Sequence, residues 1–203
     1  MVQLLVNTCL LALLQAVIPN HWLPLSALGN SENWTKQRLE LMACICACAH
    51  VMGTLLLGIS FGVAGTKLSH TYETYLHLAA PIVLILFGVA YFLVAVRMWR
   101  SDESYEQERR IGKIWMVGIF LMMLLSPCLE VHDLFIAAAD YGLNNILLLA
   151  MFYAMVNISG VVLLTLLASK LAGGLYAKYS DTGRKKITAL LLVLVGVASF
   201  FIH

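Results

Sequence analysis

Charged residues are scarce in this chain of 203 residues. They make up 12% of the sequence, whereas hydrophobic residues make up 61%, and the mean hydropathy is +0.87. A soluble domain carries about 25% charged and about 45–50% apolar residues. The chain therefore has too little polar surface for a water-soluble globule, and it predicts an all-α integral membrane protein that forms one domain over residues 1–203.

Several familiar signals are also absent. The sequence contains no P-loop, nucleophile elbow or zinc-protease helix, so we do not expect an enzyme. The net charge of +2 is too small to indicate nucleic-acid binding. The N-terminal segment lacks a basic region and a small-residue cleavage site, which favours a retained helix over a signal peptide. The cysteines all lie in apolar segments, which argues against a disulfide scaffold: Cys9, Cys44, Cys46, Cys48 and Cys128.

Apolar segments long enough to cross the hydrocarbon of a bilayer, about 20 residues, occur six times. They run roughly over 3–28, 38–65, 75–98, 113–140, 144–169 and 185–203. If the spans cross the membrane alternately, the connections after the first, third and fifth spans lie on one side. Every basic residue except Lys67 lies in or beside these connections. The positive-inside rule then predicts that both termini lie outside, and we expect the protein in a bacterial cytoplasmic (inner) membrane.

The two halves of the sequence resemble each other at a nearly constant offset of 107 or 108 residues. HVMGTLLL (50–57) aligns with NISGVVLL (157–164), LILFGVAYFL (84–93) with LVLVGVASFF (192–201), and the pair 19–20 with 127–128. Each half would hold three spans, so the second half would be inverted across the membrane. We therefore expect a 3+3 inverted repeat, with repeat one at 1–99 and repeat two at 110–203. Secondary transporters of this build bind cargo near the midplane, at interrupted helices.

Polar side chains gather at the positions where such a site is expected. Pro19 and Pro127 each remove a backbone hydrogen bond within a span, and lipid cannot satisfy the carbonyl groups that are freed. Ionisable residues at membrane depth are costly and usually face the bundle interior. We therefore predict a metal site at the interface of the two repeats, with no catalytic residue and no permanently bound cofactor. The candidate ligands are His21, His50, Cys128, Glu130, Asn20, Gln15, Asn157, His132 and Asp133.

Some of these residues also have simpler structural roles. A histidine in the middle of a helix, such as His50, can serve as a partner in an interhelical hydrogen bond. The acidic residues of 130–133 can belong to a helix end near the membrane surface. Within CICAC (44–48), the first and last cysteines share a helix face and the middle one does not, so these three cannot bind one ion. We expect them to pack as small apolar residues.

The segment QAVIPNH (15–21) resembles the first-helix signature His-x-x-x-x-Asp-His of nickel–cobalt transporters and related exporters. The pair AH (49–50) in the next helix and SPCLE (126–130) in the fourth are similar to motifs of the same families. Most of the chain thus resembles a compact member of the lysine-exporter-like superfamily. The resemblance implies secondary transport of a divalent transition-metal cation such as nickel or cobalt. Because Gln15 and Asn20 stand in place of two strong ligands, either other donors compensate or the cargo is not nickel.

Two other functions stay open. The same superfamily includes membrane thiol–disulfide carriers, which need a reactive cysteine pair. Cys128 would suit one half, but its repeat mate is Asn20, which leaves Cys44 or Cys48 as partner. A non-transporting assembly or accessory protein would explain the missing ligands. The expected partners are the lipid bilayer and the cation cargo, with no nucleic acid, and a homo-oligomer or another membrane protein is an open alternative.

Overall fold

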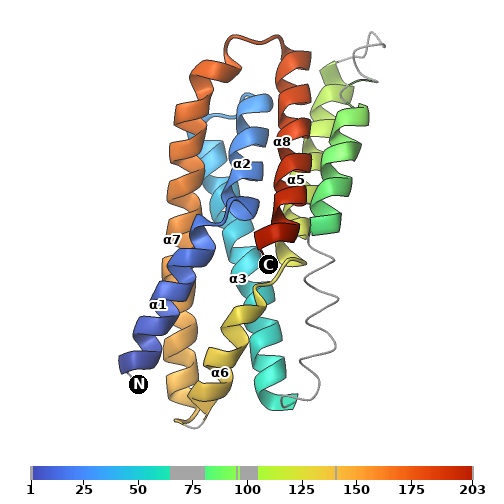
Figure 1. Ribbon diagram of the computed structural model, residues 1–203. Coiled ribbons are helices and arrows are strands. Elements are labelled where there is room, and N and C mark those ends of the chain that lie inside the picture. The colour runs from blue at the N-terminus through green and yellow to red at the C-terminus, as the bar shows by residue number, and fades with distance from the viewer. Residues whose placement is uncertain (1, 65–80, 95, 97–104, 140, 203) are drawn as a thin grey trace.

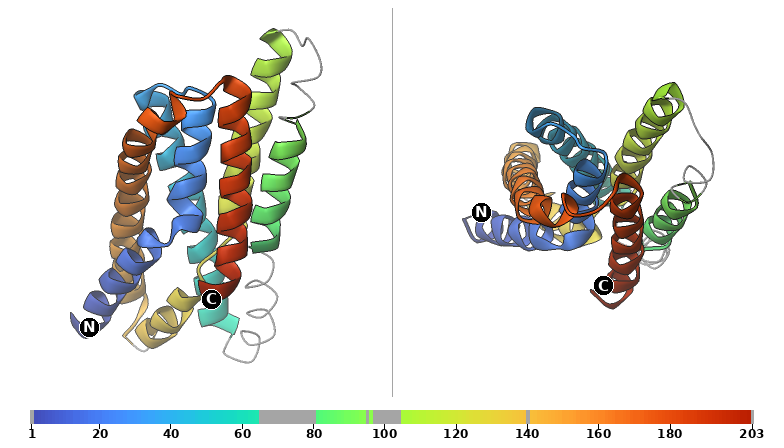
Figure 2. Two further views of the ribbon diagram at one scale, coloured as in Figure 1. Left: turned by 45° about the horizontal axis from the view of Figure 1, so that its top comes forward. Right: turned by 90° about the horizontal axis from the view of Figure 1, so that it is seen from above.

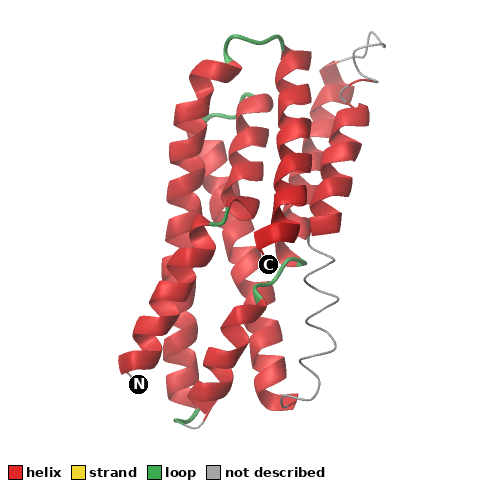
Figure 3. Ribbon diagram, viewed as in Figure 1, coloured by secondary structure: helices red, strands yellow, loops and turns green. Residues whose placement is uncertain are grey.

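The computed structural model of the protein describes residues 2–64, 81–94, 96, 105–139 and 141–202. Over these ranges the chain is helical and has no strand, which confirms the predicted all-α class (Figure 3). The elements are α1 (Val2–Val17), α2 (Pro19–Ser31), α3 (Lys36–Ala64), the helix Pro81–Val94, α5 (Tyr105–Leu124), the short 3-10 helix η1 (Leu129–Val131), α6 (His132–Ala139), α7 (Leu143–Tyr176) and α8 (Asp181–Ile202).

Two described helical segments, Lys36–Leu57 of α3 and the whole of α7, are long and apolar enough to cross a membrane. The pair α1 and α2, bent by 41° at its junction, forms a third if it is one broken span. Pro81–Val94 and Lys113–Leu124 are shorter apolar helices. The expected segment 75–98 lies partly outside the described residues. The outer surface carries many large apolar side chains, which suits contact with lipid: Leu10, Leu14, Leu41, Leu56, Leu163, Leu171 and Leu194 are examples.

The first predicted interruption lies between α1 and α2 (Figure 1). Ile18 separates the two helices, and Pro19 begins the second one, where its fixed φ suits a helix start and its missing N–H is not needed. Pro24 lies inside α2 and cannot donate to the carbonyl of Asn20 one turn earlier. The backbone carbonyl of Asn20, in the first turn of α2, therefore lacks its usual donor within the helix.

The second predicted interruption lies between α5 and α6. α5 ends at Leu124, a non-helical stretch runs to Cys128, and η1 leads into α6 (Figures 1 and 3). Pro127 falls within this stretch. The residue before a proline is disfavoured in the helical region, so the chain leaves the helix before Pro127.

Each interruption is crossed by a long helix at a glycine. A Cβ added to Gly160 of α7 would lie 2.6 Å from the Cβ of Ala16, just before the first interruption. A Cβ added to Gly53 of α3 would collide with the backbone carbonyl of Leu124, just before the second. The glycines are 107 positions apart and their partners are 108 apart, which are the offsets of the sequence repeat. In the same way, α1 and α2 pack on α7 while α5 and α6 pack on α3.

Two clusters of buried apolar side chains form the core. The larger one is built mainly by α2, α3, α5, α8 and the helix Pro81–Val94, with Ala16 of α1 and Val161 of α7 added to it. The smaller one joins α1, α3, η1, α6 and α7. Seen from above, α1 and α7 lie on one side of the bundle, and α5, α8 and Pro81–Val94 lie on the other (Figure 2). Ala47 belongs to the larger cluster and Val51 to the smaller, so His50 of α3 lies where the two clusters meet.

Candidate metal centre

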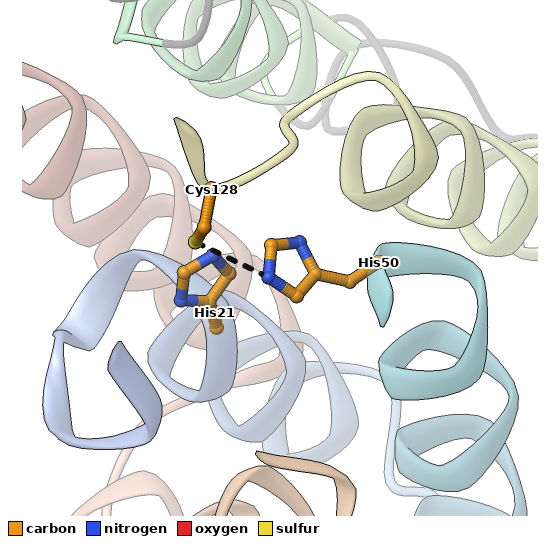
Figure 4. A group of neighbouring side chains, drawn as sticks. All are labelled: His21, His50 and Cys128. Atoms are coloured by element: carbon orange, nitrogen blue, oxygen red, sulfur yellow. Dashed lines mark hydrogen bonds between the residues drawn. The ribbon is translucent and has the colours of Figure 1, made fainter. Parts of the chain in front are cut away.

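Three strong metal ligands converge at the level of the two interruptions (Figure 4). His21 comes from the first turn of α2, His50 from the middle of α3, and Cys128 from the stretch before η1. One ligand atom from each residue lies within 4.8 Å of the other two. Because ligand atoms bound to a metal at about 2.0–2.3 Å lie within about 4 Å of one another, a contraction of about 1 Å would bring the three onto one cation.

The geometry within this trio is close. Cys128 Sγ lies 3.4 Å from His50 Nε2, and the ring centroids of His21 and His50 are 4.2 Å apart. The two histidines are only 2% and 0% exposed, and Cys128 is half-buried. Imidazole nitrogen and thiolate sulfur are favoured ligands of copper and zinc. The trio can therefore hold a transition-metal cation in surroundings that exclude most of the water.

Thr54 connects the second interruption to α3. Its Oγ1 accepts a hydrogen bond from the backbone N–H of Cys128 at 3.1 Å. The same hydroxyl donates to the backbone carbonyl of His50 at 3.0 Å. Since Thr54 lies one turn after His50, this side chain holds Cys128 at the height of the imidazole.

Gln15 joins α1, η1 and α7 beside the trio. Its Nε2 donates to Glu130 Oε2 at 3.1 Å, and its Oε1 accepts from the Tyr153 hydroxyl at 2.9 Å. Gln15 and Tyr153 are buried, whereas Glu130 is exposed. Glu130 therefore contacts the amide of Gln15 and is not a member of the trio.

Two asparagines present polar atoms to the interior. Asn157 of α7 is fully buried, and among the described residues neither amide atom has a hydrogen-bond partner. It lies one turn after Tyr153 on the same face of α7. The Oδ1 of Asn20 is likewise buried without a partner in the described part of the chain. A small cavity is lined by Asn20, His21, Pro81, Leu84, Met122, Met123, Ser126 and Ser199.

The predicted ligands thus separate into distinct groups. His21, His50 and Cys128 come together, and Gln15, Glu130 and Asn20 lie around them without entering the trio. Asp133 is exposed in the first turn of α6. His132 begins α6, but its side chain lies outside the described part of the structure.

Thr54 and Tyr153 are site residues that the sequence analysis missed. A signal was present in the sequence, because each hydroxyl is one helical turn from a polar residue in the middle of a span. Thr54 follows His50 by four positions, and Tyr153 precedes Asn157 by four. Residues four apart share a helix face, so a buried polar residue predicts that polar neighbours at this spacing are buried beside it.

The cysteines of α3 are arranged as their spacing predicts. Cys44 and Cys48 are exposed on one face, and Cys46 is buried. Each of these cysteines is a free thiol, and so is Cys128. Because the two exposed thiols face outward while His50 faces the interior, neither is placed beside Cys128 as a disulfide partner.

Comparison with known proteins adds nothing to this geometry: no protein-family model, curated protein or solved structure matches the chain.

Proposed function

We propose that the protein is a secondary membrane transporter that carries a transition-metal cation, bound by His21, His50 and Cys128 between two inverted halves. The observation that carries this proposal is the convergence of three strong ligands within 4.8 Å, two of them at helix interruptions. Interrupted helices in corresponding positions of two repeats are where transporters of this build bind their cargo. Here each interruption supplies one ligand, and the long helix α3 supplies the third.

The proposed architecture is a six-span, 3+3 inverted repeat with both termini outside. It is supported by the matched contacts Gly53–Leu124 and Gly160–Ala16, which have the same offset as the sequence repeat. It is also supported by the charges, because the connections α2–α3 and α7–α8 lie at the same end of the bundle (Figure 1). These connections and the helix ends beside them carry Lys36, Arg38, Lys178, Arg184, Lys185 and Lys186, as the cytoplasmic side of a membrane protein does.

The proposed transport movement is a rocking of one half against the other about the cation. At Gly53 the backbone of α3 packs against the backbone of α5, and at Gly160 the backbone of α7 packs against the small side chain of Ala16. No large side chain interlocks the helices at these two contacts, so the helices can slide or rotate against each other there. Each interruption supplies a bend at which the two parts of a span can change their angle. Cation release then follows when His21 and Cys128, which belong to different halves, move apart.

Cation flux into proteoliposomes tests the proposal. We expect wild-type protein to move a transition-metal cation, and we expect His50→Ala and Cys128→Ser each to abolish this flux. Cys44→Ser is the matched control, because it removes an exposed thiol from α3 and leaves the trio intact. Flux that persists in both trio variants contradicts the proposed site.

The same preparation distinguishes the two alternatives. A thiol–disulfide carrier would show a reducible intramolecular disulfide that includes Cys128, and its electron transfer would not depend on His50. An accessory protein would show neither flux nor a disulfide and would co-purify with a membrane-protein partner. Either result would replace transport as the function.

A further inference from the structure

We infer that the cation bound by His21, His50 and Cys128 is monovalent copper, Cu(I), and not nickel or cobalt. The inference rests on the proposed function and names its substrate class. It departs from the divalent cargo that the sequence resemblance implies. Four features of the site carry it: the chemical softness of the ligands, their charge, their number and the residues beside them.

The first feature is softness. The trio offers one sulfur and two imidazoles and no carboxylate. Soft thiolate and thioether ligands favour Cu(I) and zinc, and imidazole is accepted by copper, whereas carboxylates and carbonyls favour harder cations. The carboxylate nearest in sequence, Glu130, is exposed and bound by Gln15. The ligands therefore favour copper or zinc over nickel and cobalt.

The second feature is charge. Among the three ligands only Cys128 becomes an anion. On binding, its S–H bond breaks, an S–Cu bond forms, and the proton leaves to water while copper stays Cu(I). One positive charge then replaces another, and the loaded site is neutral. A divalent cation would leave one positive charge between buried histidines that no ligand of the trio compensates, which is unfavourable at membrane depth. The exposed carboxylate of Glu130, outside the trio, is the acidic group near enough to offset part of it.

The third feature is ligand number. In the part of the chain that the structure describes, the only group of three or more His, Cys, Asp or Glu residues suited to one metal ion is this trio. Zinc in proteins is almost always four-coordinate and would need a further ligand. Cu(I) is a closed-shell ion that accepts two or three ligands. A set of two buried histidines and one half-buried cysteine is therefore complete for Cu(I) and incomplete for zinc.

The fourth feature is the cavity beside His21. Met122 and Met123 help to line it, and both side chains are buried in the bundle. A thioether is a weak, uncharged and soft ligand, so it can receive Cu(I) without holding it. Methionines that line the same cavity as His21 give a copper ion soft neighbours there, and they offer little to nickel or cobalt.

Competitive titration of the purified full chain, kept reduced and free of oxygen in detergent, tests the inference. Cu(I) is offered as its bicinchoninate complex, and Ni²⁺, Co²⁺ and Zn²⁺ are offered with a chromophoric chelator. We expect the protein to take one Cu(I) per chain, with an affinity about 1,000-fold or more above that for nickel or cobalt. Cys128→Ser should lower the Cu(I) affinity about 100-fold or more, and Cys44→Ser should not change it.

The outcomes separate the two proposals. The copper inference is overturned if the protein binds Ni²⁺, Co²⁺ or Zn²⁺ more tightly than Cu(I) and loses this binding in His50→Ala. That result still supports the proposed transporter. No binding of any of these cations by the wild-type chain overturns both. Should Cys128→Ser fail to fold, X-ray absorption by Cu(I) on the wild-type chain decides: one sulfur and two nitrogens support the inference, and a shell without sulfur overturns it.

Discussion

The two helix interruptions of this protein share a backbone device but differ in what they expose. The first is abrupt, with Ile18 alone between α1 and α2, and α2 restarts on Pro19. The second is longer, with a non-helical stretch and a 3-10 turn between α5 and α6. The first presents the imidazole of His21, and the second presents the thiol of Cys128.

The comparison teaches that, in the proposed repeat, the bend and the close helix crossing are common to both halves while the side chains at the bend differ. The prolines are 108 positions apart and the crossing glycines 107 apart, and each pair lies at a bend or a close approach of the same kind. The ligands do not recur: His50 corresponds to Asn157, and Cys128 corresponds to Asn20. In the proposed transporter a single cation between the halves needs only one set of strong ligands, which one histidine of α3 and one residue from each interruption supply.

The largest expected effect comes from making α3 like its counterpart. His50→Asn introduces the residue that α7 carries at Asn157, and an amide is a weak ligand for a soft cation. We expect the cation affinity to fall about 100-fold or more, because loss of a residue that only holds a ligand in place already costs about 10–100-fold. Equilibrium titration measures it. The control is Asn157→Leu, for which we expect an unchanged affinity, and an equal loss there would make Asn157 a ligand.

The next largest effect is the loss of stability when a glycine at either helix crossing is replaced by alanine. In Gly53→Ala the new methyl group meets the backbone carbonyl of Leu124, so α5 itself must move. In Gly160→Ala it meets the side chain of Ala16 at 2.6 Å. We expect a loss of about 2–3 kcal/mol for Gly53→Ala and about 1–2 kcal/mol for Gly160→Ala, within the range for overpacking. Thermal unfolding in detergent shows which variant loses more stability, and a larger loss in Gly160→Ala than in Gly53→Ala would refute the prediction.

A smaller effect concerns the hydrogen bonds that link the first interruption to the second. Gln15→Leu removes the donor to Glu130 and leaves the buried Tyr153 hydroxyl without its acceptor. We expect a loss of about 1–2 kcal/mol in the free energy of unfolding. Because Tyr153→Phe removes the same hydrogen bond, the double variant should lose less than the sum of the single variants. Additive losses would show that the two side chains are not coupled.

The smallest effect tests the start of α8, which belongs to the second half. Burial raises the pKa of the Asp181 carboxyl, but hydrogen bonds and charges from Lys185 and Arg184 outweigh this and leave the pKa below its ordinary value. The ion pairs therefore stabilise the fold above the ordinary pKa of aspartate, and this contribution is lost as the pH falls through the lowered one.

Because the Asp181 side chain is 48% exposed, solvent screening keeps this contribution small. We expect Asp181→Asn to lower the free energy of unfolding by less than about 0.5 kcal/mol at neutral pH. The difference from wild type should vanish in acid and shrink in high salt. Unfolding curves across pH measure it, and a difference that persists in acid would exclude the ion pairs as its cause.

Local patterns were enough to predict much of this molecule. Hydropathy indicated helices, and Pro19 and Pro127 marked both interruptions, because a proline disturbs a helix wherever the helix lies. The face shared by Cys44 and Cys48 followed from helical periodicity in the same way. Nine candidate ligands could be named from the sequence, but three of them converge on one point. Nothing local distinguishes Glu130, which stays outside, from Cys128 two positions earlier.

By itself, then, the sequence determined the helical class, the apolar surface and the two bends, since each depends on residues within a few turns of one another. Only the tertiary structure decided that His21, His50 and Cys128 face one point and that Gln15 holds Glu130 aside. The reason is physical: the direction of a side chain depends on how its helix is rotated against its neighbours. That rotation is set by close contacts such as those of Gly53 and Gly160, between residues that are far apart along the chain.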